Sequence, residues 1–151
     1  MFQMSSPDAW HDFELVTKSK PLAIRETLNQ IRHFISPFAL EPAFVDTLEL
    51  VLAEALNNVV EHAHGDNSDG VIWLRCAREP SGFVLQIRDD GNAMPNGQIP
   101  NTPMALRHGA FNSVPEGGFG WHLIRHLADR VDYQRLAGQN CLTLHVPFTQ
   151  S

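Results

Sequence analysis

The chain has little positive charge and no long apolar run, and each shortage argues against a class of protein. Its 151 residues include 11 Lys and Arg against 17 Asp and Glu, for a formal net charge of -6. Nucleic acid is therefore not expected as a direct partner, because phosphate binding needs clustered Lys and Arg. No charged stretch followed by an apolar run opens the chain, and no apolar segment approaches membrane-spanning length. We expect a cytoplasmic protein without membrane attachment.

Cysteines and several short catalytic motifs are equally scarce. Only Cys76 and Cys141 are present, both in apolar strand-like segments, which favours reduced thiols over a disulfide. The zinc motif HExxH is missing, and so are the short motifs of serine and cysteine nucleophiles. Nothing in these patterns predicts a zinc enzyme or a hydrolase.

What remains is the composition of an ordinary globular protein. Hydrophobic residues make up 43% of the chain and charged residues 19%. The length suits one domain with a real core. We expect a single domain over residues 1–151, with its core at about 10–148 and neither repeats nor a linker.

The periodicity of apolar residues predicts the element order β-α-α-β-β-lid-α-β-β. Residues 92–117 are rich in Gly and Pro and too long for an ordinary connection, so we interpret them as a disordered segment or a functional lid. The order favours an α/β (α+β) two-layer sandwich, a mixed sheet with its helices on one face. The predicted strands are 13–17, 71–77, 83–88, 131–135 and 141–146, and the predicted helices are 22–34, 42–63 and 119–129.

A polar row stands out in the predicted helix 42–63. Glu54, Asn58 and His62 follow at intervals of four residues, which would place them on one helix face. Asn58 offers a neutral carbonyl oxygen, a hard ligand suited to Mg²⁺. Glu54 could accept a proton from an attacking hydroxyl or water. A solvated polar stripe is the competing interpretation.

An acidic turn follows the predicted strand 83–88. Asp89 and Asp90 precede Gly91, a pattern that is also typical of a plain turn. In the functional interpretation Asp89 accepts a hydrogen bond from an adenine amino group, and Gly91 lets the base approach.

Three glycines open the predicted helix 119–129. Gly117, Gly118 and Gly120 fall within four residues, which is more than a helix cap requires. A helix N-terminus attracts anions, and glycine lets a ligand come close to the backbone. No strand leads directly into the run, and no Gly-Lys-Ser/Thr follows it, so neither a Rossmann motif nor a P-loop is present.

In this order the three motifs resemble the N, G1 and G2 boxes of the ATPase superfamily shared by gyrase, the heat-shock chaperone, histidine kinases and mismatch-repair proteins. The resemblance is closer to bacterial anti-sigma-factor serine/threonine kinases of the RsbW type. Residues 52–62, with the sequence LAEALNNVVEH, look like their N-box helix, and residues 117–134 with 140–144 are similar to their C-terminal part. The resemblance extends over roughly residues 10–148.

The resemblance implies the Bergerat-type ATP-binding fold, with ATP and Mg²⁺ as cofactors. It implies Glu54 as the general base and Asn58 as the Mg²⁺ ligand. Asp89 would contact adenine beside Gly91, and His62 would pack under the nucleotide or orient Glu54. The further nucleotide-binding positions that it implies are Ala93, Gly117, Gly118 and Gly120.

Two positions depart from the family pattern. Ala93 stands where the G1 box usually has its second glycine, as in the shortened variant of many anti-sigma kinases. Glu116 stands where some relatives carry an arginine that meets the γ-phosphate. Arg107 and His108 are the lid residues that could replace this arginine.

Two functional hypotheses follow. In the first, the chain is an anti-sigma factor that binds ATP and phosphorylates a serine of an anti-sigma-factor antagonist, with a sigma factor as its other partner and a homodimer as its assembly. In the second, motivated by Glu116, it is a non-catalytic module that binds ATP or ADP and sequesters a sigma factor or another regulator.

Overall fold

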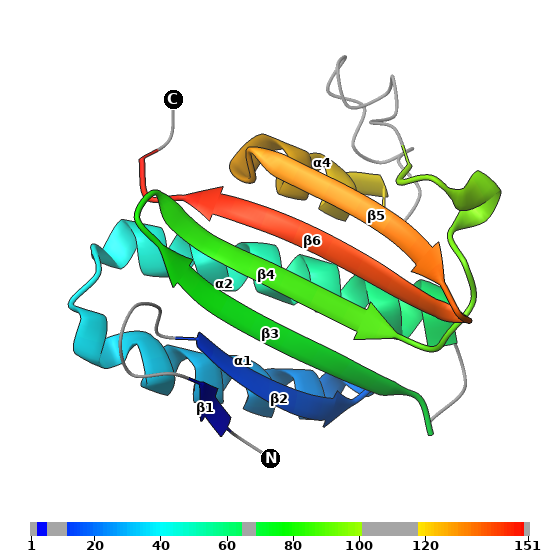
Figure 1. The fold of residues 1–151 in the computed structure, drawn as a ribbon, viewed down its shortest axis with the longest axis horizontal. Helices are drawn as coiled ribbons and strands as arrows, with labels where there is room; N and C mark the ends of the chain where they lie inside the picture. The colour runs from blue at the N-terminus through cyan, green and yellow to red at the C-terminus, as the bar shows by residue number, and fades with distance from the viewer. Residues whose placement is uncertain (1–2, 6–11, 65–68, 101–117, 150–151) are drawn as a thin grey trace.

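The computed structural model describes residues 3–5, 12–64, 69–100 and 118–149. One sheet and three long helices make up most of these residues (Figure 1). The strands are β1 (Gln3–Ser5), β2 (Asp12–Lys18), β3 (Val71–Glu79), β4 (Gly82–Asp89), β5 (Arg130–Leu136) and β6 (Gln139–Pro147). The helices are α1 (Pro21–Ile35), α2 (Pro42–Asn58) and α4 (Gly118–Leu127), with short helical turns at Ser36–Phe38, Val59–His64 and Pro95–Gly97.

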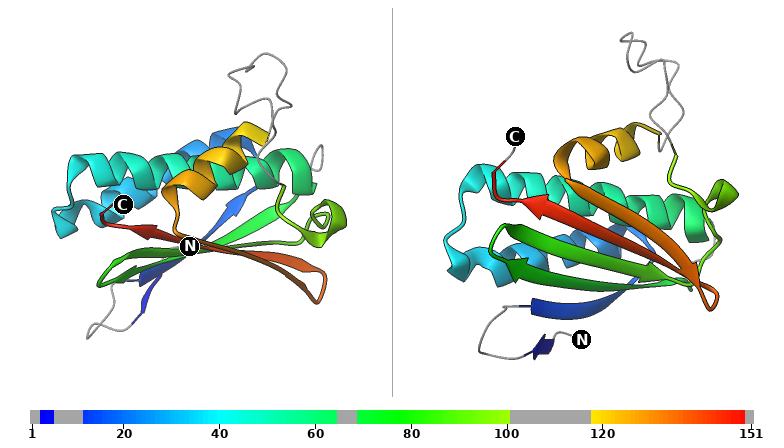
Figure 2. Two further views of the ribbon diagram at one scale, coloured as in Figure 1. Left: turned by 90° about the horizontal axis from the view of Figure 1, so that it is seen from above. Right: turned by 45° about the horizontal axis from the view of Figure 1, so that its top comes forward.

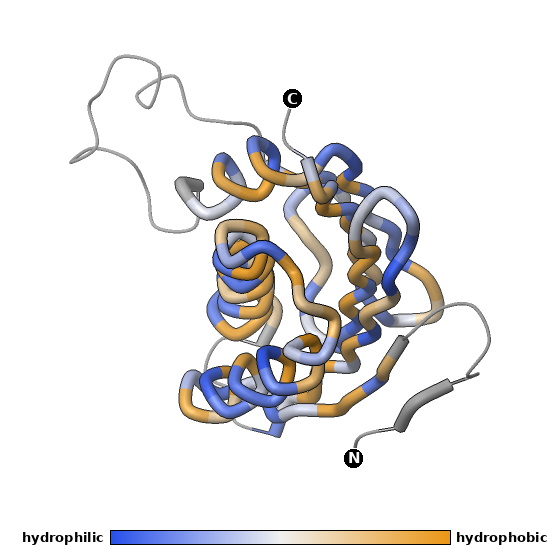
Figure 3. Tube along the Cα trace, turned by 90° about the vertical axis from the view of Figure 1, so that its left-hand side faces the viewer, coloured by the Kyte–Doolittle hydropathy of each residue, from blue (hydrophilic) through white to orange (hydrophobic). Residues whose placement is uncertain are grey.

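The helices all cover one face of the sheet, as the sequence predicted (Figure 2). The strand order is β1-β2-β3-β4-β6-β5. Apolar side chains of the sheet and the helices fill the space between the two layers, and the hydropathy colouring shows such residues recurring along the helices and strands (Figure 3). In β6 the alternation is complete, since every second residue from Asn140 to Val146 is buried.

The prediction of a mixed sheet is wrong, because every neighbouring pair of described strands is antiparallel. Two successive helices, α1 and α2, separate β2 from β3, so the chain returns in the opposite direction. The single helix α4 does place β5 parallel to β4, as a crossover should. However, β6 folds back from β5 and pairs with both, which removes the parallel contact.

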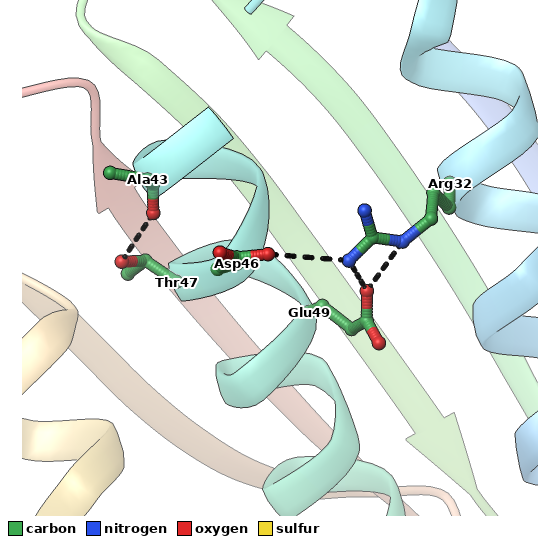
Figure 4. Close-up of polar contacts among 5 residues, drawn as sticks. All are labelled: Arg32, Ala43, Asp46, Thr47 and Glu49. Atoms are coloured by element: carbon green, nitrogen blue, oxygen red, sulfur yellow. Dashed lines mark hydrogen bonds and ion pairs between the residues drawn. The ribbon is translucent and has the colours of Figure 1, made fainter. Parts of the chain in front are cut away.

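Two prolines mark the starts of α1 and α2, and an arginine links the two helices. Pro21 and Pro42 each occupy the first helical position, where the missing N–H is not needed. Arg32 of α1 donates hydrogen bonds to Glu49 and Asp46 of α2 (Figure 4). These carboxylates raise the pKa of Arg32 above its ordinary value. The contacts are exposed, so they add little to stability.

Cys76 and Cys141 are free thiols, and burial raises the pKa of the Cys76 thiol.

Strand β1 was absent from the sequence-based prediction, which also ended β3 two residues early and β6 one residue early. Among the described helices, none combines the length and apolar character that crossing a membrane requires.

We predict that Leu48→Ala lowers the free energy of unfolding by about 2–5 kcal/mol, because Leu48 is 1% exposed in the core between α2 and the sheet. The control is Leu50→Ala on the same helix, where the side chain is 40% exposed and the expected loss is within about 0.5 kcal/mol. Urea unfolding of both variants checks the difference. Equal losses would contradict the placement of α2.

Candidate functional site

The polar end of α2 lies against the first turn of α4. Glu54 is half-buried and Asn58 is buried, and both face Gly120. A Cβ atom added to Gly120 would lie 2.6 Å from Glu54 Oε2 and 3.6 Å from Asn58 Oδ1. The two oxygens therefore border the same small space, and only a glycine leaves that space open. The structure brings these three predicted site residues together.

Glu54 and Asn58 both lie in surroundings that are unfavourable for a polar side chain. Burial raises the pKa of Glu54, and the nearby Glu61 carboxylate raises it further. Asn58 Nδ2 is buried and has no hydrogen-bond partner among the described residues. An unsatisfied buried polar group costs about 1–3 kcal/mol. Such a group is expected where a ligand completes the site.

His62 lies in the π-helical turn Val59–His64 that follows α2. Its side chain is 53% exposed, and its Nε2 lies 3.7 Å from Glu61 Oε2. A contact between His62 and the nucleotide therefore stays a prediction.

Asp89 ends β4 and is 3% exposed. Its Oδ1 accepts two hydrogen bonds, from the Gly91 N–H at 2.9 Å and from Asn140 Nδ2 at 2.8 Å. Both bonds end on Oδ1, which leaves Oδ2 without a hydrogen bond to any described residue. Fixed hydrogen bonds of this kind keep a carboxylate oriented for a further donor.

Gly91 joins the end of β4 to the π-helical turn. A Cβ atom added there would lie 2.4 Å from the Ala63 carbonyl oxygen, a backbone atom that cannot move aside. The same oxygen accepts the Asn92 N–H at 2.7 Å. The acidic turn is thus held against the π-helical turn that follows α2.

Sequence reasoning missed a polar network on β5 and β6. Tyr133 donates its hydroxyl hydrogen to Asn140 Oδ1 and accepts the Met94 N–H at 3.1 Å. Arg135 donates to the Gly91 carbonyl oxygen at 2.6 Å and to Asn140 Oδ1 at 3.0 Å. One feature of the sequence could have indicated the network. Asn140 is two and four residues from the apolar Leu142 and Leu144, so in a strand it faces the same side of the sheet as they do. A polar residue on that side is buried and needs partners.

The other predicted positions are described only in part. Ala93 is exposed, between Asn92 and Met94. Gly118 is the first residue of α4. Within the predicted lid, residues 92–100 are described, and Arg125 of α4 donates to the Ile99 carbonyl oxygen at 3.4 Å. The remaining positions, Arg107, His108, Glu116 and Gly117, lie outside the described residues.

Two solved structures share this architecture. One contains the RsbU and RsbW domains of a Mycobacterium tuberculosis protein, with a TM-score of 0.62, 16% identity, and coverage of 90% of this chain and 32% of that chain. The other is the histidine kinase domain of a blue-light activated histidine kinase from Erythrobacter litoralis, with a TM-score of 0.50, 18% identity, and coverage of 83% and 61%. At these identities the likeness concerns the fold.

Sequence comparisons give the family. The serine/threonine-protein kinase BtrW of Bordetella bronchiseptica is 36% identical over 98 residues, which cover 65% of this chain and 67% of that protein. An anti-sigma F factor of Priestia megaterium is 26% identical over 98 residues, covering 61% of this chain and 63% of its own length. The matched stretch thus spans less than two thirds of the latter relative. The family model of the histidine kinase-like ATPase domain matches residues 17–146. The chain belongs to the histidine kinase-like ATPase domain family.

Proposed function

We propose that this chain binds ATP with Mg²⁺ and transfers the γ-phosphate to a serine of an anti-sigma-factor antagonist, while it sequesters a sigma factor in the absence of that antagonist. The convergence of Glu54 and Asn58 on Gly120, next to the Asp89 turn, is the observation that carries the proposal. The names of the relatives, a serine/threonine-protein kinase and anti-sigma F factors, support the substrate class and the partners.

Asp89 is suited to select the base. Its Oδ1 is occupied by Gly91 and Asn140, and Oδ2 is left for an exocyclic amino group. A carboxylate only accepts hydrogen bonds, so it favours adenine over a base that presents a carbonyl oxygen at that edge.

The phosphates would lie at the first turn of α4. Its N-terminal end points toward the end of α2 and the start of the predicted lid (Figure 1). Backbone N–H groups at Gly118 and Gly120 would bind phosphate oxygens, because helix N-termini bear unpaired donors and a partial positive charge. Gly117 and Ala93 would border the same nucleotide, and His62 would lie at its rim.

The residues present fit a magnesium ion. Asn58 Oδ1 is a hard oxygen donor at the edge of the space beside Gly120, and Mg²⁺ takes such a ligand together with waters and phosphate oxygens. Asn58 would hold the ion, which when bound would neutralise charge on the transferring phosphoryl group. Glu54 would then accept the proton of the attacking serine hydroxyl. Its raised pKa brings the carboxyl closer to the operating pH, as base catalysis requires.

We propose that the protein is cytoplasmic and that it forms a homodimer, and the open face of the sheet supports the dimer. The helices leave this face uncovered, and a groove of about 450 Å³ crosses it. At the groove, Arg88 lies over the Trp73 ring at 6.0 Å. The groove is lined by Glu14, Leu15, Val16, Trp73, Leu74, Arg75, Gln86, Arg88 and Cys141.

We predict that Asp89→Asn weakens ATP binding about 10- to 100-fold, the value of a hydrogen bond to a charged group. An amide offers only one acceptor oxygen, so it cannot serve both the Gly91–Asn140 pair and the base. Asp90→Asn removes the same charge one residue later and is expected to bind ATP like the wild type. Calorimetric titration with ATP measures both, and equal losses would refute the role of Asp89.

We predict that Glu54→Gln lowers phosphotransfer about 10²- to 10⁴-fold while ATP still binds. The readout is labelled phosphate on a serine of the antagonist captured from the source cell, with Asn58→Ala as a second inactive variant. Binding of ATP and of a sigma factor without any transfer by the wild type would support the non-catalytic alternative that Glu116 motivates.

The pH dependence follows from the raised pKa of Glu54. Transfer should rise with pH through this raised value, because the base must be ionised. Stability changes in the opposite direction. Between the ordinary and the raised pKa the unfolded chain loses its proton first, so the wild type loses stability there as pH rises, and Glu54→Gln does not. Unfolding curves of both proteins across that window test the sign.

We predict that Gly120→Ala lowers phosphotransfer about 100-fold, since a displacement of about 1 Å at a reacting group has that effect. The new Cβ would meet the movable end of Glu54, so the packing of α4 should survive. Gly138→Ala is the control, because its Cβ would meet nothing within 4 Å. Its positive φ of 77° makes this variant a test of backbone strain alone. Wild-type transfer by Gly120→Ala would contradict the proposed geometry.

A further inference from the structure

Three residues from separate parts of the chain meet at the end of the sheet away from Asp89. Ser81 lies in the turn between β3 and β4, Asp129 lies between α4 and β5, and His145 lies on β6. Ser81 directly precedes β4 and Asp89 ends it, so about 25 Å of extended chain separates this cluster from the candidate nucleotide site (Figure 1).

The contacts form a continuous hydrogen-bonded relay. His145 Nδ1 lies 2.5 Å from Asp129 Oδ1, and the Asp129 N–H donates to the His145 carbonyl oxygen at 3.0 Å. The backbone bond holds Asp129 beside β6. Because a carboxylate only accepts, its contact with the ring favours the neutral imidazole that carries its proton on Nδ1. The lone pair of Nε2 then faces Ser81 Oγ at 3.0 Å. Nucleophile, base and orienting carboxylate thus have the separations of an activated serine.

The surroundings suit a reaction at Ser81. Ser81 is exposed, whereas the His145 side chain is only 13% exposed. Glu79 Oε2 lies 3.9 Å from His145 Nε2 and would stabilise an imidazolium there. Phe148 donates its N–H to the Ser81 carbonyl oxygen at 2.9 Å, which ties the turn to an aromatic cluster with Phe44 and Phe83.

We propose that Ser81, His145 and Asp129 form an acylation site for activated carboxylic esters. In the first step Ser81 Oγ bonds to the ester carbonyl carbon, and its proton passes to His145 Nε2. The ester C–O bond then breaks, and the leaving alcohol takes that proton. A water oxygen, its proton taken by the same nitrogen, then bonds to the acyl carbon. The bond between that carbon and Ser81 Oγ breaks, Nε2 returns the proton to Oγ, and the free acid leaves. No electrons are exchanged with an outside acceptor.

The experiment treats the full chain with p-nitrophenyl acetate, quenches samples with acid during the initial burst, before the acyl group is released, and measures acetylation of each serine by peptide mass spectrometry. Ser36 is the internal control, because it is exposed but its Oγ donates to the His33 carbonyl oxygen instead of a ring nitrogen. We expect Ser81 to acetylate about 100-fold faster than Ser36, the lower range of general-base catalysis. His145→Gln should remove this advantage, and Asp129→Asn should reduce it. Ser81→Ala should abolish the burst of p-nitrophenolate.

Equal acetylation of Ser81 and Ser36 in the wild type would overturn the proposal, and so would an unchanged Ser81 rate in a folded His145→Gln variant. Thermal unfolding and ATP titration show whether each variant is folded. If His145→Gln does not fold, the ratio of the two serines within the wild type decides. Because Ser81 and the nucleotide site are at opposite ends of β4, Ser81→Ala should leave ATP binding unchanged.

Discussion

The pair of hydrogen bonds at Asp89 Oδ1 is the constraint on which the rest of the site depends. One bond closes the turn onto the Gly91 N–H, and the other ties β4 to β6 through Asn140. Tyr133 and Arg135 then secure Asn140 and the Gly91 carbonyl oxygen from β5. A single carboxylate oxygen thus ties the turn after β4 to β6, at the end of the sheet where β5 also contributes hydrogen bonds. The other carboxylate oxygen is kept for a ligand.

The two candidate site residues at the end of α2, Glu54 and Asn58, lower the stability of the folded protein. Upstream the helix buries an apolar face that includes Leu48, Leu52 and Leu56. At its end it carries a carboxyl with a raised pKa and an amide without a partner. Local conflicts of this kind persist only when the surrounding structure enforces them, and they gather at functional sites. The buried upstream turns provide that enforcement here.

Helices and strands were predicted from the sequence more accurately than the contacts between them. Alternation over β4 and β6 and the helical period over α1 and α2 are local properties, so the strands and helices emerged near their observed bounds. The sheet is fully antiparallel because β6 lies between β4 and β5. No local sequence pattern encodes that position. The π-helical turn at Val59–His64 was not predicted either, since residue spacing alone assumes a regular helix. Ser81, Asp129 and His145 are far apart in the chain, and only folding brings them together.

Strand β5 forms one edge of the sheet, and its composition limits how molecules of this protein can meet. Its exposed residues are polar except for Leu136, and Arg130 pairs with Asp132 at 2.6 Å along the edge. Charged edges discourage the addition of foreign strands, which is the route to open-ended aggregation. The addition of a further strand at this edge is thereby disfavoured. The strand that contributes Tyr133 and Arg135 to the polar network therefore also protects this edge of the sheet from strand addition.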